Sequence, residues 1–261
     1  GPRTPEAFAE RAAEVVARGY RALKFDPFGA AWRVMSPAER TLSLEIVAGV
    51  REAVGPNIQI MIEGHSRFSV AEAIWVGERL VDYEPTWFEE PIAHQHIGAT
   101  AEVARRISVP VATGESFTST QQFAELLSHN SVHILQPDPG NMGGIWRTRQ
   151  VCAMADAHYA VVAPHQAQGP ICTAVCVQLG AATPNLMIQE LFDEFNSGWE
   201  REIVEPPVVV RDGAIVVPDR PGLGIDLNWS EVEKHPYQAQ NFLPLFAPGW
   251  ERRIGDEGGD R

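Results

Sequence analysis

Short apolar runs alternate with longer amphipathic stretches along most of this chain, and this alternation limits the possible folds more than any other feature. Helical patterns occupy residues 5–18, 38–54, 70–81, 101–107, 120–127, 145–157 and 171–182. Between them lie seven runs with the β-branched and aromatic composition of strands, at residues 20–25, 58–62, 86–88, 109–112, 132–135, 160–162 and 186–188. Strands that alternate with helices predict an α/β fold on a parallel sheet, either a barrel or a doubly wound sheet.

The number of strands and the length of the chain favour an incomplete barrel. A (β/α)8 (TIM) barrel takes ~250 residues and eight strands, whereas this chain has 261 residues, seven strand-like runs and a first element that is helical. We therefore expect residues 1–190 to form a (β/α)7 part of a barrel whose first strand lies outside the chain. We expect residues 191–261 to form a C-terminal segment that packs back on it, with β-like runs at 208–210 and 214–217 and a disordered tail.

Charge and composition exclude several classes of function. The formal net charge of −13 argues against nucleic acid or an anionic membrane as partner. No apolar run approaches the ~20 residues that span a bilayer, and the N-terminus lacks a signal-peptide pattern. The three cysteines are too few for a disulfide framework and are expected to be small core residues. These features predict a cytoplasmic protein.

Three glutamates stand where consecutive apolar strands stop, namely Glu63, Glu89 and Glu115. The two intervals are equal, 89 − 63 = 26 and 115 − 89 = 26, so each interval is one βα unit and the three carboxylates share the C-terminal rim, where barrel active sites are built. A single glutamate at a strand end is usually solvated or capping. Three carboxylates brought together repel unless a cation lies between them, and oxygen ligands without Cys or His favour Mg2+.

The next strand ends supply a candidate general base. Asp138 follows the strand after Glu115, His165 follows the one after that, and Gln189-Glu190 closes the last. An aspartate beside a histidine on the neighbouring strand can orient the imidazole and raise its basicity. A lone histidine at a strand end would more often be a structural hydrogen-bonding group, but the position of His165 next to Asp138 favours catalysis.

In this order and spacing, the strand-end residues resemble the mandelate racemase/muconate lactonizing enzyme branch of the enolase superfamily. The resemblance rests on Glu63, Phe88-Glu89-Glu90-Pro91, Gly114-Glu115, Pro137-Asp138, Gly143-Gly144, Pro164-His165 and Ile188-Gln189-Glu190. It implies a Mg2+-dependent enzyme that abstracts a proton α to a carboxylate, an N-terminal α+β capping domain that this chain lacks, and a homo-oligomer. The enolase superfamily pairs a Lys or His base with Mg2+.

Two motifs point to one activity within that branch. Racemases carry Lys-x-Lys where this chain has Lys24-Phe25-Asp26, so Lys24 is expected either to neutralise the substrate carboxylate or to pair with Asp26. The stretch Glu63-Gly64-His65 followed by Arg67 resembles galactonate dehydratase, in which the histidine is the acid for the departing 3-hydroxyl. So does the segment 164–170. Arg67 and Asp26 are then predicted to bind the substrate, a small carboxylate sugar.

The sequence therefore predicts an acid-sugar dehydratase. His165, oriented by Asp138, would remove the C2 proton, Mg2+ and Glu190 would stabilise the enediolate, and His65 would protonate the leaving hydroxyl to give a 2-keto-3-deoxy acid. His65 could instead only hydrogen-bond a metal ligand. Two further alternatives stay open: a racemase, epimerase or lactone cycloisomerase with the same metal and base, or a barrel that serves as a binding or structural subunit.

Overall fold

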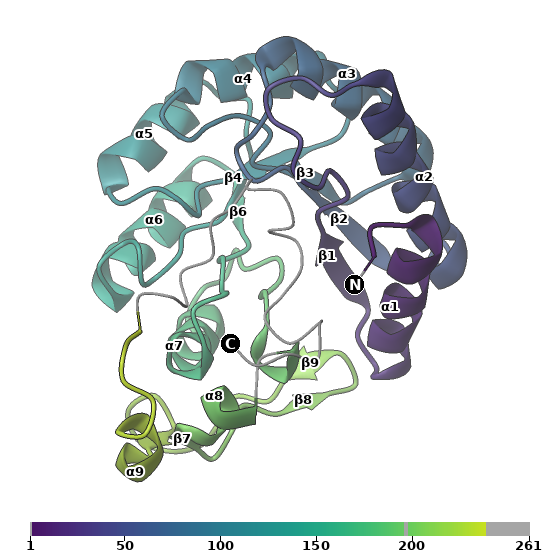
Figure 1. The fold of residues 1–261 in the computed structure, drawn as a ribbon. Coiled ribbons are helices and arrows are strands. Elements are labelled where there is room, and N and C mark those ends of the chain that lie inside the picture. Colours follow the sequence, from purple (N-terminus) through teal and green to yellow (C-terminus); the bar gives the residue numbers. More distant parts are fainter. Residues whose placement is uncertain (1, 196–197, 239–261) are drawn as a thin grey trace. The chain divides into compact units, whose positions relative to one another are not determined.

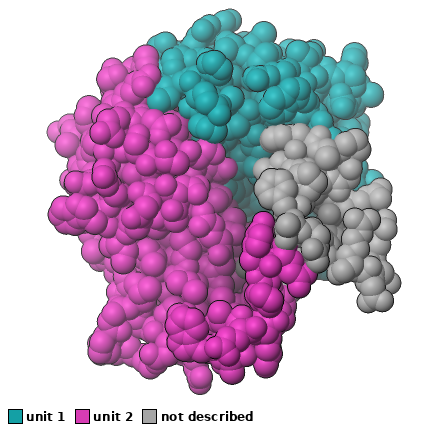
Figure 2. Space-filling view, turned by 60° about the vertical axis from the view of Figure 1, so that its left-hand side comes forward, with its two compact units in different colours: residues 1–111, 239–261 teal, residues 112–238 magenta. Residues whose placement is uncertain are grey.

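The computed structural model describes residues 2–195 and 198–238, which fall into two compact units (Figure 2). The first runs to Val111 and the second from Ala112 to Gln238. The tail that was expected to be disordered lies within residues 239–261, which are outside the described residues.

Six strands form one parallel sheet in the order β1-β2-β3-β4-β5-β6, as the sequence predicted for its first six runs (Figure 1). They are β1 (Ala22–Phe25), β2 (Gln59–Glu63), β3 (Trp87–Glu89), β4 (Val111–Thr113), β5 (Ile134–Leu135) and β6 (Val161–Val162). The helices between and around them are α1 (Pro5–Ala17), α2 (Pro37–Val54), α3 (Val70–Leu80), α4 (Ile97–Arg106), α5 (Thr120–Ser128), α6 (Ile145–Ala157) and α7 (Pro170–Ala181). A 3-10 turn, η1 (Val81–Tyr83), follows α3.

Local capping explains where several of these helices begin. Thr4 caps α1 by accepting a hydrogen bond from the amide of Ala7 at 3.3 Å. Ser36 and Glu39 form a reciprocal capping box at the start of α2, in which each side chain satisfies the other residue's amide. Such caps satisfy backbone groups that have no partner inside the helix, so the helix starts are fixed locally by the sequence.

In the first unit, the strand register brings polar strand ends to one edge. β1 pairs with β2, and β2 pairs with β3 so that Glu63 stands directly opposite Glu89. Ile60, Ile62 and Phe88 are fully buried, while the amide of Phe88 donates to the carbonyl of Pro110 at 2.8 Å just before β4. The apolar strand bodies therefore hold the carboxyl ends of β2 and β3 in register.

In the second unit, β5 pairs with both β4 and β6, but the seventh predicted strand is absent. Within the described residues, run 186–188 makes only an isolated parallel bridge, between Leu186 and Val162. The reason lies in Pro164, which has no amide hydrogen to donate to the next ladder bond, while its carbonyl accepts at 3.0 Å from the side-chain amide of Gln189 instead of from a backbone amide. The sequence prediction of a strand at 186–188 was wrong.

Short elements follow the sheet. They are η2 (Asp193–Phe195), α8 (Gly198–Glu202), β7 (Val204–Glu205), β8 (Val210–Arg211), β9 (Ala214–Ile215), β10 (Asp226–Leu227) and α9 (Trp229–Val232). β8 and β9 form an antiparallel pair at the two predicted β-like runs, with β8 ending one residue beyond the first run, and β10 pairs with β7. None of the three cysteines is in a disulfide, and only Cys172 is partly exposed. No helix among the described residues is long and apolar enough to cross a membrane.

Candidate active site

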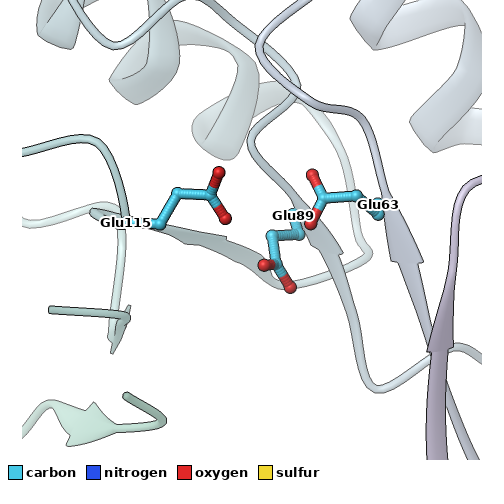
Figure 3. A group of neighbouring side chains, drawn as sticks. All are labelled: Glu63, Glu89 and Glu115. Carbon is cyan, nitrogen blue, oxygen red and sulfur yellow. The ribbon is translucent and has the colours of Figure 1, made fainter. Parts of the chain in front are cut away.

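Two buried carboxylates lie at the ends of β2 and β3 with a lysine between them. Figure 3 shows Glu63 and Glu89 extending from these adjacent strand ends. Nζ of Lys24, from β1, lies 3.2 Å from Oε2 of Glu63 and also pairs with Oε1 of Glu89. The indole of Trp87 donates to the other oxygen of Glu89 at 2.7 Å. The sequence offered Asp26 as one possible partner of Lys24. In the structure Lys24 pairs with Glu63 and Glu89 instead.

Glu63 has the properties of a ligand for a hard cation. Its side chain is 3% exposed, and its Oε2 has no hydrogen-bond donor, although Lys24 lies near it. Burial raises the pKa of Glu63, but the charges of His65 and Lys24 and hydrogen bonds with the side chain of Glu89 and the amide of His65 outweigh it and hold that pKa well below its usual range. Lys24 offsets part of the charge of this oxygen but gives it no hydrogen bond, so its lone pairs are available to a hard cation. The donor set therefore fits a Mg2+ ion.

The turn after β2 is fixed by the end of β3. The amides of Gly64 and Ser66 donate to the carbonyls of Glu89 and Glu90 at 2.8 Å and 2.7 Å. His65 and Ser66 have positive φ angles of 46° and 59°, a sparsely populated conformation for residues other than glycine. Glu90 accepts a 2.5 Å hydrogen bond from the hydroxyl of Ser66. The turn that carries His65 is therefore hydrogen-bonded to the end of β3 through both backbone and side chain.

Asp26, His65 and Arg67 form a cluster in the first unit. Nδ1 of His65 lies 2.6 Å from Oδ2 of Asp26, which also pairs with Nη2 of Arg67. The guanidinium of Arg67 is fully buried and donates further to the carbonyls of Gly64 and Gly29. This placement does not support the expected contact of Arg67 with substrate, and it puts Asp26 against His65.

The second unit contains a second Asp–His pair. Nδ1 of His165 lies 2.7 Å from Oδ2 of Asp138, whose side chain is completely buried. Oδ1 of Asp138 accepts from the amides of Gly140 and Asn141 at 2.7 Å and 3.1 Å, and its Oδ2 accepts from the side chain of Gln168 at 2.9 Å. With Nδ1 directed at a carboxylate, the lone pair of a neutral His165 is on Nε2.

Two carboxylates lie near Nε2 of His165. The nearer oxygen of Glu115 is 3.5 Å away and that of Glu190 is 3.9 Å away. Glu190 accepts a 2.9 Å hydrogen bond from the amide of Gln166, while the carbonyl of Glu115 accepts one from the side chain of Asn141. The second unit thus brings Asp138, His165, Glu190 and Glu115 together.

The sequence did not indicate a role for three of the supporting residues. Gln168 binds Asp138, Gln166 bridges to Thr173 and Gly169, and Trp87 binds Glu89. The two glutamines belong to the polar run after the His165 strand, so this run was a usable signal. Trp87 offered none, since a tryptophan inside an apolar strand is typical of a core residue.

Comparison with known proteins places the chain in a family. Residues 7–232 match the family model described as enolase C-terminal domain-like. The chain is 38% identical over 250 residues to a D-gluconate dehydratase of Thermoproteus tenax, covering 96% of this chain and 50% of that protein. It is 31% identical over 246 residues to a D-gluconate/D-galactonate dehydratase of Picrophilus torridus, covering 94% and 63%.

A solved structure of similar fold agrees with this placement. A mandelate racemase/muconate lactonizing enzyme-like protein from Roseovarius sp. TM1035 matches with a TM-score of 0.84 and 36% identity, over 90% of this chain and 60% of that one. The chain therefore spans about half to two thirds of the length of these relatives.

Proposed function

Because the chain belongs to the enolase C-terminal domain-like family, we propose that it supplies the active-site residues of a Mg2+-dependent acid-sugar dehydratase. The names of the two curated relatives give the substrate class, an aldonic acid, and the reaction, loss of water. The observation that carries the proposal is the 2.7 Å contact between His165 and the buried Asp138, because such a pair fits removal of a proton that is only weakly acidic.

We assign the metal to the candidate acidic ligand group Glu63, Glu89 and Glu115 (Figure 3). Support comes from the buried oxygen of Glu63 that lacks a donor and from the absence of softer ligands in the group. When bound, Mg2+ supplies positive charge that neutralises the substrate carboxylate and the negative charge that grows as the C2 proton leaves.

His165 is the general base in this proposal. Its Nε2 takes the C2 proton of the aldonate, and the electrons of that C–H bond pass toward the carboxylate to give an enediolate. Asp138 keeps Nδ1 protonated and stabilises the imidazolium that forms. Glu190, 3.9 Å from Nε2, is assigned to the oxygen on which charge develops.

His65 is the general acid. The C3–O bond breaks, His65 gives its proton to the departing hydroxyl so that water leaves, and the enol product tautomerises to a 2-keto-3-deoxy acid. Lys24, beside Glu63 and Glu89, is assigned to the charge of the substrate carboxylate.

A substrate panel tests the proposal. D-Gluconate, D-galactonate and D-xylonate are incubated with the intact protein and Mg2+, and formation of 2-keto-3-deoxy acid is followed by a semicarbazide assay. We expect turnover of at least one of them, its loss on chelation with EDTA, and its loss in His165→Asn. Epimerised or isomerised product without any 2-keto acid would replace the dehydratase by a racemase or a cycloisomerase.

A further inference from the structure

The contacts among Asp26, His65 and Arg67 indicate a different role for Asp26 and Arg67, which the sequence assigned to substrate binding. We propose that Asp26 is a positioning residue that fixes the orientation and tautomer of His65, and that Arg67 holds Asp26 in place. The inference rests on the proposed function in one respect, since it gives His65 the task of protonating the leaving hydroxyl.

The three side chains differ in their exposure to solvent. Arg67 is 0% exposed, Asp26 is 9% exposed and His65 is 27% exposed. Only the imidazole is therefore accessible enough to contact a sugar, while the carboxylate and the guanidinium lie behind it. Arg67 is also fixed at three points, because it donates to Asp26 and to the carbonyls of Gly64 and Gly29.

Hydrogen bonds define the orientation of Asp26. Its Oδ1 accepts from the amide of Phe28 at 2.8 Å, which leaves Oδ2 for Arg67 and His65. A carboxylate that is ion-paired with a buried guanidinium is an acceptor on both oxygens. Nδ1 of His65, only 2.6 Å away, must then carry the hydrogen.

A longer contact between Arg67 and His65 would favour the opposite tautomer, but it is weaker than the contact with Asp26. Nη2 of Arg67 lies 3.3 Å from Nδ1 of His65, a distance at which the guanidinium could donate to an unprotonated ring nitrogen. The 2.6 Å contact with Asp26 is shorter and charge-assisted, and such bonds are the stronger class. The proton therefore belongs on Nδ1, and Nε2 is the nitrogen that exchanges a proton with the substrate.

The backbone adds to this positioning. His65 and Ser66 have positive φ, and the amide of His65 donates to Oε1 of Glu63 at 2.6 Å. Backbone strain of this kind persists where the surroundings over-determine the conformation, and it gathers at functional sites. Arg67 contributes directly, since its Nε donates at 2.8 Å to the carbonyl of Gly64 in the same turn.

The first test is spectroscopic and needs no substrate. Histidine nitrogens of the intact, 15N-labelled protein with Mg2+ are recorded by long-range proton–nitrogen correlation above pH 8, and the His65 signals are identified by their loss in His65→Asn. We expect the Nδ1–H tautomer for His65. The Nε2–H tautomer in the wild-type protein would overturn the proposal, whether or not the protein dehydrates aldonates.

The second test is kinetic and uses Asp26→Asn, which keeps the shape of the side chain. With Oδ1 still on the Phe28 amide, the new NH2 group faces Nδ1 of His65, which favours the opposite tautomer, and Arg67 loses the acceptor that Oδ2 provided. We expect kcat for dehydration to fall about 10- to 100-fold with KM changed less than threefold, and exchange of the C2 proton to be retained. A change confined to KM would instead make Asp26 a substrate ligand.

A double variant distinguishes positioning from general stability. If Asp26 acts through His65, then Asp26→Asn should cause no further loss in a His65→Asn background. Losses that multiply would overturn the proposal. If Asp26→Asn fails to fold, as judged by circular dichroism, the tautomer of the wild-type protein decides the question. If the wild-type protein shows no dehydration, the proposed function fails and the tautomer still decides.

Discussion

Asp138 holds the ring of His165 from its buried side, with Oδ2 of the carboxylate 2.7 Å from Nδ1 of the imidazole. The carboxylate is itself fixed by the amides of Gly140 and Asn141 and by the side chain of Gln168. The carboxylate cannot rotate without breaking these hydrogen bonds, and the ring cannot rotate without losing its contact with Oδ2.

Asp138→Asn should remove the base without removing the side chain. The two backbone amides keep the Asn oxygen in the place of Oδ1, so its NH2 group faces Nδ1 of His165 and shifts the proton to Nε2. We expect exchange of the substrate's C2 proton with D2O, followed by proton NMR, to slow by about 10²- to 10⁴-fold. Exchange at the wild-type rate would show that Asp138 does not act through His165.

Replacing each histidine should separate the two halves of the reaction. His165→Asn should abolish both C2 proton exchange and dehydration. His65→Asn should retain part of the exchange and lower dehydration by about 10²- to 10⁴-fold, since abstraction of the proton does not need the acid for the hydroxyl.

Two outcomes of that experiment would contradict these assignments. Near wild-type dehydration by the His65 variant would remove the main support for His65 as the acid. Exchange that survives in His165→Asn but disappears in Lys24→Met would indicate a lysine base, and a racemase or epimerase would then be the better assignment.

Lys24→Met should make the protein depend on Mg2+ for stability. Lys24 is the cation beside two carboxylates that are 3% and 0% exposed, and removal of one partner from a buried ion pair typically costs about 3–5 kcal/mol. We expect a lower Tm without metal and a larger rise in Tm on adding Mg2+ than in the wild-type protein, since the ion neutralises the same acids.

A surface variant serves as the control for that measurement. Arg106 pairs with Glu102 at 3.7 Å, but both side chains are more than half exposed, and such pairs contribute little. Arg106→Met should leave both the Tm and its response to Mg2+ nearly unchanged. An equal Mg2+ response in Lys24→Met and the wild-type protein would separate Lys24 from the metal site.

Gly64→Ala should destabilise the turn that carries His65. A Cβ at this position would lie 2.9 Å from the carbonyl oxygens of Glu89 and Glu90, which belong to backbone and cannot easily move. We expect a loss of about 1–3 kcal/mol in the free energy of unfolding, from urea denaturation. Gly98→Ala, in α4 with no atom near the new Cβ, should be neutral or stabilising by about 0.5–1 kcal/mol.

The sequence by itself determined the order and type of the main elements. Helices α2 and α6 lie within one residue of their predicted bounds, because capping residues such as Ser36 and apolar periodicity act over a few neighbouring positions. The same local signals marked the ends of β2 and β3, so the sequence alone assigned Glu63 and Glu89 to one sheet edge, where the two residues are paired.

Only the tertiary structure decided which polar groups meet. Asp26 contacts His65 and Arg67, which are 39 and 41 positions away, and Lys24 pairs with Glu63 and Glu89 instead of Asp26. The strand expected at 186–188 is reduced to one bridge because Pro164 has no amide hydrogen and its carbonyl accepts from the side chain of Gln189. Hydrophobic periodicity tells which face of an element is buried, but hydrogen bonds and ion pairs depend on distances between atoms from separate strands, and those distances are set by register and packing.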